Sequence, residues 1–502
     1  MPAPADPRLP PPAPVTPPAP ADWRTPAGVA ETHISVVVFV GDRAYKLLKP
    51  VDVGFLDYST LEARRRACQR EVELNRRFAP DVYLGVLDVV DERGRTCDHL
   101  IAMRRMPAER RLSQLLDAPE AADHVRAVAR LVAAVHQRSP TSPAVQAAAT
   151  PEAVRGNWED NFAQLRRFAG PVLDAGEVER VASLVREYLD GRAPLLLRRI
   201  RDGWVRDGHG DLLADDVFML DDGPRVIDCL AFDDRLRHGD VVADVAFLAM
   251  DLERLGHPGL GAALVRWYEE FSGERHPASL AHHYIAYRAH VRAKVACLRV
   301  GQGDAAAAAA ARDAHRLALR HLARGRVRLV LVGGAPGAGK TTLAERLSQE
   351  TGWMLLRSDE IRKDLAGIGH LEPAAAPPDR GIYAPEMTER VYAELIGRAR
   401  RLLELGESVV LDASWTAAAH RARAREAAAA ACAPAYELRC DVPAQVAAAR
   451  VSRRRGDASD ARAQIARLLY ERAGEWGVRV DTSGSLERAV ADAIAAVREP
   501  EE

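Results

Sequence analysis

Two patterns of apolar positions divide the chain near residue 325. Before it, short apolar strands come in pairs joined by turns, and long stretches with helical spacing follow them. After it, single apolar strands alternate with helices to the end of the chain. Paired strands with separate helices are typical of an α+β domain, and strands alternating with helices predict a parallel sheet covered on both faces. We therefore expect a multidomain protein of α+β and α/β class.

The first part is predicted to occupy residues 32–324. Its start is marked by two apolar runs that flank a Gly-Asp turn, and Ser59-Thr60 then caps a helix. In chain order we expect a hairpin of strands 34–40 and 43–48, a helix from Ser59 to about Phe78, strands at 82–90 and 99–103, helices over 111–201, strands at 217–220 and 225–227, and helices to residue 323.

The second part is predicted to occupy residues 325–502 as one α/β domain. Its strands are continuous apolar runs, as expected for strands buried on both faces. They are expected at 327–332, 353–356, 408–411, 435–440 and 478–480, with helices between them. Residues 1–31 are rich in Pro and Ala and are predicted to be a disordered tail.

Composition excludes several classes of protein. Lys and Arg total 70 against 71 Asp and Glu, so the formal net charge is −1, and no binding to nucleic acid or to an anionic membrane is expected. The six cysteines contain no Cys-x-x-Cys pair, which favours a reducing cytoplasm over a disulfide framework or a zinc ribbon. No apolar run is long enough to span a membrane.

Lysine is rare in this chain. Only five of the 70 basic residues are Lys, and the rest are Arg. Each lysine is therefore a candidate for a role that needs a compact ammonium group. The five are Lys46, Lys49, Lys294, Lys340 and Lys363.

A phosphate-binding motif begins at Gly334. The segment 334–341 matches G-x-x-x-x-G-K-[ST] in full, between an apolar strand and a helix. Its glycines let backbone N–H groups surround phosphates, Lys340 reaches the β- and γ-phosphates, and the Thr341 hydroxyl binds Mg²⁺. The predicted cofactors are therefore ATP and Mg²⁺. The expected contact residues are Gly334, Ala335, Pro336, Gly337, Ala338, Gly339, Lys340, Thr341 and Thr342.

Two carboxylates follow neighbouring strands of the same part. Asp412 ends the strand at 408–411, where it would hold Mg²⁺ through water. Asp359 follows the strand at 353–356 and is a candidate base for an acceptor hydroxyl, with Arg362 one turn later to hold an acidic group. The alternative for Asp359 is a helix N-cap.

A basic cluster at 450–457 follows a predicted helix. Arg450 and Arg454 are candidate lid residues that close over the transferred phosphate. The alternative is a solvated helix end. Taken together, residues 326–500 resemble the P-loop kinase group that includes polynucleotide kinase, the zeta-toxin kinases and gluconate kinases. The P-loop alone indicates only an NTP, and the Asp359-x-x-Arg362 pair is what points to a kinase rather than a motor or a GTPase.

The first part carries His209-Gly210-Asp211-Leu212 before a short hairpin, and Asp228 at the end of that hairpin. Over residues 32–323 it resembles the aminoglycoside phosphotransferase family, two-lobed relatives of the protein kinases. The resemblance implies that Asp211 is the base, that Asp228 is a Mg²⁺ ligand, and that Lys46 pairs with Glu71 and binds phosphates. Otherwise Lys46 is an edge-strand residue and Glu71 an exposed acid.

Two positions depart from the pattern of that family. Where the family has His-Gly-Asp-Leu-His-x-x-Asn, this chain has Leu213 and Asp216 in place of the second His and the Asn. A carboxylate ligates a hard cation as well as an amide does, so Asp216 is retained as a metal ligand. The site is therefore expected to be partly degenerate. Nearby, Asp240 is expected to cap a helix and Asp244 to be a structural ion-pair partner, neither of them catalytic.

The whole arrangement resembles bacterial proteins that join an aminoglycoside phosphotransferase-like domain to a P-loop kinase domain. It implies an ATP-dependent kinase for a hydroxyl of a small-molecule substrate, with the C-terminal site competent. One alternative is an ATP-hydrolysing regulatory or stress protein with a ligand-sensing pseudokinase domain, and another is a 5′-hydroxyl polynucleotide kinase. The acceptor and the oligomeric state are left open.

Overall fold

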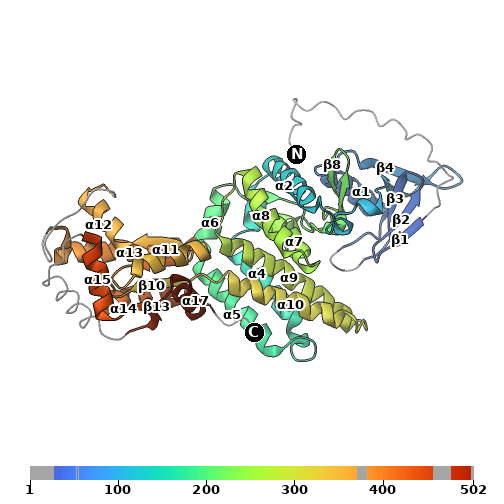
Figure 1. Ribbon diagram of the computed structural model, residues 1–502. Helices are drawn as coiled ribbons and strands as arrows, with labels where there is room; N and C mark the ends of the chain where they lie inside the picture. Colours follow the sequence, from blue (N-terminus) through green and yellow to red (C-terminus); the bar gives the residue numbers. More distant parts are fainter. Residues whose placement is uncertain (1–27, 53, 55, 370–380, 456–475, 499–502) are drawn as a thin grey trace. The chain divides into compact units, whose positions relative to one another are not determined.

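The computed structural model describes residues 28–52, 54, 56–369, 381–455 and 476–498. The chain divides into two compact units, and Figure 1 shows their elements. One consists of the residues up to Ala148 together with Val205–Glu274, and the other of Ala149–Trp204 together with the residues from Arg275 onward. Within the described ranges, no helix combines the length and the apolar character that crossing a membrane requires.

The first unit begins with an antiparallel five-stranded sheet of order β1-β2-β3-β5-β4. The predicted hairpin is present, but Gly28–Glu31, placed in the tail from sequence, pairs with β2 as an added edge strand. A long helix packs on the sheet, capped by the Thr60 hydroxyl as expected. The elements are β1 (Gly28–Glu31), β2 (Ser35–Val40), β3 (Arg43–Leu48), α1 (Leu61–Asn75), β4 (Tyr83–Val90) and β5 (Thr96–Arg104).

The rest of the first unit is mainly helical and carries two small antiparallel sheets of two strands each, of which β7 and β8 form a hairpin. The pairing of β6 with β9 brings the backbone before His209 beside the backbone before α7, and Asp240 caps α7 as expected. The elements are α2 (Ala121–Arg138), α3 (Pro143–Ala147), β6 (Val205–Asp207), β7 (Val217–Leu220), β8 (Gly223–Val226), β9 (His238–Asp240), α7 (Val241–Arg254) and α8 (Pro258–Ser272).

The second unit contains the predicted parallel sheet, of order β11-β12-β10-β13-β14. Strand β10 lies at its centre and is buried along its whole length. The α/β class predicted for the C-terminal part is therefore confirmed. The elements are β10 (Leu329–Gly333), α11 (Lys340–Thr351), β11 (Met354–Arg357), α12 (Ser358–Ala366), α13 (Pro385–Glu404), β12 (Val409–Asp412), α14 (Ala418–Ala430), β13 (Ala435–Asp441), α15 (Ala444–Arg455), β14 (Val478–Asp481) and α17 (Leu486–Val497).

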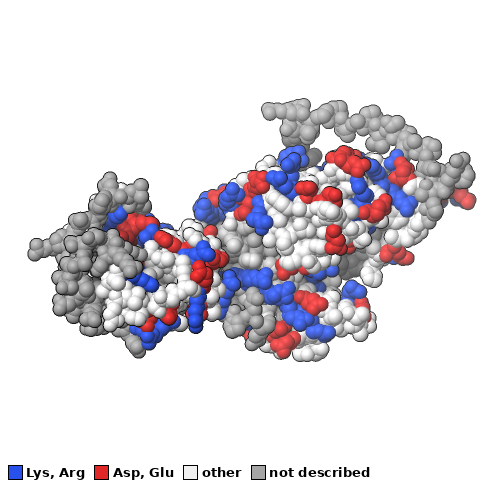
Figure 2. Space-filling view, in the orientation of Figure 1, with Lys and Arg blue, Asp and Glu red and all other residues white. Residues whose placement is uncertain are grey.

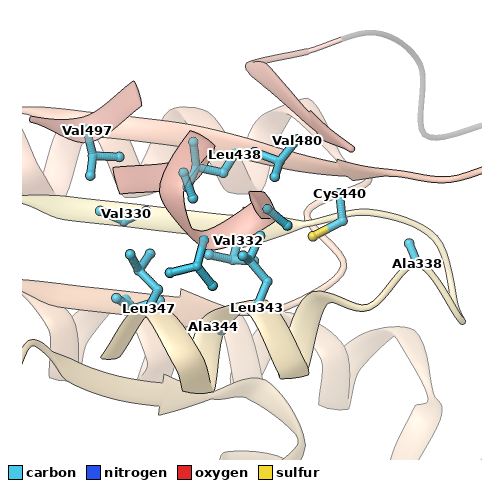
Figure 3. Close-up of a cluster of buried hydrophobic side chains, with 14 of the residues drawn as sticks. Val330, Val332, Ala338, Leu343, Ala344, Leu347, Leu438, Cys440, Val480 and Val497 are labelled. Carbon is cyan, nitrogen blue, oxygen red and sulfur yellow. The ribbon is translucent and has the colours of Figure 1, made fainter. Parts of the chain in front are cut away.

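The core of this sheet shows why continuous apolar runs were needed. Val330 and Val332 point to one face, where they pack against Leu343 and Leu347 of α11 and against α17 (Figure 3). Leu331, between them, faces the opposite side because side chains alternate along a strand, and it is equally buried. Helices therefore cover both faces of the sheet, and only the strand ends remain available for a ligand.

Five helices that precede residue 325 in sequence belong to this second unit. The Arg192 guanidinium, 1% exposed, donates to the backbone carbonyls of Leu403, Ala431 (2.7 Å) and Cys432 (3.1 Å), at the C-terminal ends of α13 and α14. Those carbonyls carry the negative ends of the helix dipoles and stabilise the buried cation. The five helices are α4 (Pro151–Leu165), α5 (Ala175–Gly191), α6 (Ala193–Arg201), α9 (Ala278–Gly301) and α10 (Ala307–Arg324).

Candidate functional sites

The loop at 334–339 has the backbone that a phosphate cradle requires. Gly334, Gly337 and Gly339 have φ values of 136°, 82° and 89°, a region that residues with a Cβ rarely adopt. A Cβ at Gly334 would also lie 2.8 Å from the carbonyl oxygen of Cys440. The methyl groups of Ala335 and Ala338 are buried and fix the loop to the core. Backbone N–H groups are thus held at the N-terminus of α11, where negative charge is favoured.

Lys340 and Thr341, the first two residues of α11, lie beside Asp412 at the end of β12. The Thr341 hydroxyl donates to Asp412 Oδ2 at 2.8 Å, and the Lys340 ammonium donates to the Ala335 carbonyl oxygen at 3.1 Å. Burial raises the pKa of Asp412, although the Thr341 hydrogen bond and the charge of Lys340 lower it. A hydroxyl and a carboxylate oxygen side by side are the donors that Mg²⁺ prefers, so these residues fit an ATP–Mg²⁺ complex.

Asp359 and Arg362 lie one turn apart on α12. Helix α12 starts at Ser358 with Arg357 as N-cap and no side-chain cap, so the alternative that Asp359 caps this helix is wrong. Asp359 is exposed, and its charge contributes to raising the pKa of Asp412. Arg362 is 9% exposed and donates to the Ile382 carbonyl at 2.7 Å, and among the described residues no carboxylate pairs with it.

Sequence reasoning missed two features at this edge of the sheet. Arg357 pairs in register with Asp412 across β11 and β12, and its Nε lies 3.7 Å from Asp412 Oδ2. Trp415, three residues after Asp412, has a φ of 52°, and its backbone N–H donates to the Tyr392 hydroxyl at 3.2 Å. The sequence could have pointed to Arg357, because a basic residue at the end of a predicted strand is visible in it. No sequence signal marks the strained backbone at a bulky residue such as Trp415.

Of the two predicted lid arginines, one can be placed. Arg450 donates to the Thr482 carbonyl at 2.9 Å, and Thr482 in turn donates to the Ala338 carbonyl of the phosphate loop at 2.6 Å. The side chain of Arg454 lies outside the part of the chain that is described. Pro336 in the loop and Thr342 in the first turn of α11, also expected to contact nucleotide, are both exposed.

The first unit brings together Lys46, Glu71 and Asp228. Lys46 Nζ lies 2.7 Å from Glu71 Oε1 and 3.4 Å from Asp228 Oδ1. Strand β3 is internal to its sheet and Glu71 is buried, so the edge-strand alternative for Lys46 and the exposed alternative for Glu71 are wrong. Burial opposes the charge of Lys46, but Glu71 and Asp228 outweigh it and raise its pKa. The Lys46 charge in turn lowers the pKa of Asp228.

Asp211 follows a loop whose backbone N–H groups are hydrogen-bonded to the Asp244 carboxylate. Asp244 accepts the N–H groups of His209 (2.6 Å) and Gly210 (2.8 Å), and it also contacts His136 Nε2 at 3.1 Å. Asp244 was expected to be a structural ion-pair partner, and the contact with His136 gives it a buried polar partner; its positioning of the loop is a feature that sequence reasoning missed. Burial lowers the pKa of His209, whose Nε2 lies 3.0 Å from the Ile227 carbonyl, next to Asp228.

Four carboxylates of this unit, Asp211, Asp215, Asp216 and Asp228, lie near enough to one another for their charges to interact. Burial, together with the charges of Asp228, Asp211 and Asp215, raises the pKa of Asp216 to about 8. A divalent cation would relieve such repulsion, and carboxylate oxygens are the ligand type that Mg²⁺ prefers. Leu213 occupies the position of the missing His and leaves no imidazole there.

Two family models match the chain, one on each side of residue 325. Residues 58–283 match the family described as "Phosphotransferase enzyme family", and residues 329–473 match the family described as "AAA domain". A gluconokinase structure from Sinorhizobium meliloti is 21% identical and covers 34% of this chain and 92% of its own, with a TM-score of 0.26. A choline/ethanolamine kinase family protein from Mesorhizobium loti is 16% identical and covers 60% and 89%, with a TM-score of 0.38.

A relative from mycobacteria matches most of this chain. An uncharacterized protein of Mycobacterium tuberculosis (strain ATCC 25618 / H37Rv) is 42% identical over 468 residues, which are 93% of this chain and 94% of the relative. The match runs through both parts of the chain. The chain therefore belongs to the family of two-domain proteins that includes this mycobacterial relative and joins a kinase-like phosphotransferase domain to a P-loop kinase domain.

Proposed function

We propose that the protein is an ATP-dependent kinase that phosphorylates a hydroxyl group of a small molecule at its C-terminal site. The observation that supports this most strongly is the 2.8 Å hydrogen bond from the Thr341 hydroxyl to the Asp412 carboxylate. Thr341 lies in the first turn of α11, the helix that begins with Lys340 directly after the glycine-rich loop. Bound ATP–Mg²⁺ supplies the phosphoryl group and a divalent positive charge. The residues of the chain supply binding, orientation and proton transfer.

Each residue of the C-terminal site has a proposed task. Loop N–H groups and Lys340 bind phosphate oxygens, while Thr341 and Asp412 hold the metal ion, the carboxylate through water. Asp359 accepts the proton of the acceptor hydroxyl, and its exposure leaves it accessible to an acceptor. Arg362, which is buried without a carboxylate partner among the described residues, orients the acceptor.

The N-terminal site is proposed to be a second nucleotide site in a domain of residues 32–324, with the P-loop kinase domain at 325–502. Lys46 would bind phosphates, oriented by Glu71, while Asp216 and Asp228 would hold Mg²⁺ and Asp211 would face the acceptor. The ion pair of Lys46 with Glu71 at 2.7 Å supports nucleotide binding. The absence of an imidazole at Leu213 supports a slower reaction there.

A small acceptor is favoured over a nucleic acid. The formal net charge is −1, and on the face drawn in Figure 2 basic and acidic side chains of the described residues are interspersed. A nucleic-acid surface would gather basic residues. All six cysteines are free, which supports a cytoplasmic location.

The test is a phosphorylation assay with γ-labelled ATP, Mg²⁺ and a panel of sugars, polyols, amino alcohols and a 5′-hydroxyl oligonucleotide. We expect one small molecule to be labelled, and Asp359→Asn or Lys340→Ala to abolish labelling. Asp364→Asn is the matched control, because Asp364 lies on the same helix and pairs with Arg398. Hydrolysis without any labelled acceptor would instead support the regulatory alternative, and a labelled oligonucleotide the polynucleotide kinase.

A further inference from the structure

The C-terminal end of α1 contacts both backbone segments that carry the candidate catalytic groups of the first unit. Asn75, fully buried, accepts the Cys229 N–H through Oδ1 at 2.8 Å, and its Nδ2 donates to the Glu71 carbonyl at 2.9 Å. Cys229 directly follows Asp228, and Glu71 is the partner of Lys46. One amide side chain therefore joins the helix that carries the ion pair to the segment that carries the candidate metal ligand.

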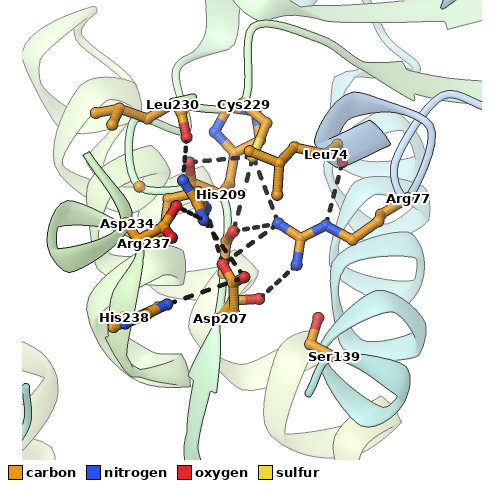
Figure 4. Close-up of polar contacts among 12 residues, drawn as sticks. Leu74, Arg77, Ser139, Asp207, His209, Cys229, Leu230, Asp234, Arg237 and His238 are labelled. Atoms are coloured by element: carbon orange, nitrogen blue, oxygen red, sulfur yellow. Dashed lines mark hydrogen bonds and ion pairs between the residues drawn. The ribbon is translucent and has the colours of Figure 1, made fainter. Parts of the chain in front are cut away.

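Arg77 makes the corresponding connection to the other segment. Its guanidinium donates to the backbone carbonyls of Asp207 at 2.9 Å and Gly208 at 2.8 Å, and it lies 3.5 Å from the Asp207 carboxylate (Figure 4). These carbonyls precede His209 and Asp211. The Phe78 ring adds an edge-on contact with the His209 ring, with centroids 5.1 Å apart.

The segment that Asn75 contacts contains a strained backbone conformation at Asp228. Asp228 has a φ of 63°, a left-handed conformation that is unfavourable for a residue with a Cβ. Two hydrogen bonds fix this conformation from outside the segment. Tyr83 accepts the Asp228 N–H through its hydroxyl at 3.2 Å, and Asn75 accepts the next N–H along the chain. Without them the backbone at Asp228 would relax to a commoner conformation and move its carboxylate.

We propose that Asn75 and Arg77 are positioning residues of the N-terminal phosphotransferase site, which hold α1, the Asp211 loop and the Asp228 segment together before nucleotide arrives. This inference rests on the proposed nucleotide binding at that site. The further point is that Lys46, Glu71 and Asp228 already have the arrangement that binds nucleotide. No partner protein or modification is then needed to move α1 into place. A nucleotide then binds in one step, because no fraction of its affinity is lost to assembling the site.

The kinetics of nucleotide binding separate positioning from mere stability. In the full-length Lys340→Ala protein, whose C-terminal site is disabled, mant-ATP with Mg²⁺ should bind in a single phase whose rate rises linearly with concentration. In Asn75→Ala and Arg77→Met variants of that protein we expect at least a tenfold weaker affinity and a rate that levels off at high nucleotide, because α1 must dock first.

Arg76→Met is the matched control. Arg76 also donates to two carbonyls, at Tyr83 (2.8 Å) and Leu84 (2.6 Å), both in β4. Tyr83 contacts the Asp228 segment through its side-chain hydroxyl, whereas Arg76 contacts only its backbone carbonyl, so Arg76 itself touches neither catalytic segment. Thermal unfolding shows how much each variant loses in stability. We expect the control to lose stability but to retain the affinity and the single-phase kinetics of the parent.

Hydrogen exchange without nucleotide decides the structural part independently. The amides of 208–211 and 228–230 should exchange faster in Asn75→Ala and Arg77→Met than in the parent or in Arg76→Met. Unchanged exchange in both variants, or faster exchange with unchanged binding kinetics, overturns the proposal. If exchange rises as expected but the Lys340→Ala protein takes up no mant-ATP, the coupling of α1 stands and the proposed nucleotide function of this site fails.

Discussion

Gly191, at the end of α5, lies so close to Ala431 after α14 that a Cβ on Gly191 would be 2.3 Å from the Ala431 carbonyl oxygen. The same carbonyl accepts a hydrogen bond from Arg192 at 2.7 Å. Helices that precede the parallel sheet by more than a hundred residues therefore contact the ends of its own helices through backbone. The glycine makes this close approach possible.

Gly191→Ala should therefore destabilise the second unit. The added methyl group meets backbone, which cannot move aside as a flexible side chain can, so we expect a loss of about 1–3 kcal/mol in the free energy of unfolding. Gly156→Ala is the control, because Gly156 lies inside α4 with open space around its Cβ position. It should be neutral or stabilise the protein by up to ~1 kcal/mol. Urea unfolding measures both, and equal values for the two variants would contradict the contact.

Thr341→Val should separate the binding of metal from the binding of nucleotide at the C-terminal site. The substitution keeps the shape of the side chain but removes the hydroxyl that contacts Asp412. We expect at least a tenfold loss of affinity for ATP with Mg²⁺, of the order of 1.4 kcal/mol, and a much smaller loss for ATP in EDTA. Titration calorimetry in the Lys46→Ala background measures this, with Thr351→Val, at the far end of α11, as the control.

The stoichiometry of nucleotide binding should be two per chain. Lys46 and Lys340 belong to different units, and each lies beside its own set of candidate metal ligands. We expect equilibrium dialysis with ATP–Mg²⁺ to give about two sites in the parent, one in Lys46→Ala or Lys340→Ala, and none in the double variant. A parent that binds a single nucleotide, unaffected by Lys46→Ala, would remove the N-terminal site from the proposal.

Acid should destabilise the second unit through buried histidines. Burial lowers the pKa of His283 and of His290 to about 3, and neither ring nitrogen of His290 has a hydrogen-bond partner within the described structure. Each group is neutral in the folded protein and binds a proton on unfolding below about pH 6.5. The contribution of these two neutral histidines to the free energy of unfolding is therefore fully present above pH 6.5. It is lost progressively as the pH is lowered from 6.5 toward 3.

His290→Phe should make this loss less steep. The ring already packs against Trp158 and Phe162, so phenylalanine fits its surroundings and removes one titrating group. We expect the slope of unfolding free energy against pH, between about pH 4 and 6, to decrease by up to ~1.4 kcal/mol per pH unit. Val295→Ala, at an exposed position of the same helix, removes no titrating group and should leave the slope unchanged. Chemical unfolding at a series of pH values gives the comparison.

The amino-acid sequence by itself determined the phosphate loop and the parallel sheet around it. Residues Gly334 to Thr341 are contiguous, and their chemistry depends on local backbone: left-handed glycines, a buried strand before them and a helix N-terminus after them. The Lys46–Glu71 pair was predicted from the resemblance to a known family. The two residues lie on a hairpin and on the helix that follows it, so short connections bring them together.

Tertiary structure alone decided the contacts between distant segments. Asp244 was expected to be a structural ion-pair partner, but only the packing of α7 showed that it holds the His209 loop. Asn75 and Arg77 look like ordinary polar residues at the end of a helix until the fold places them against Cys229 and Gly208. Such roles depend on which backbone groups the packing leaves without a partner, and that is a property of the assembled chain, which no local pattern of residues expresses.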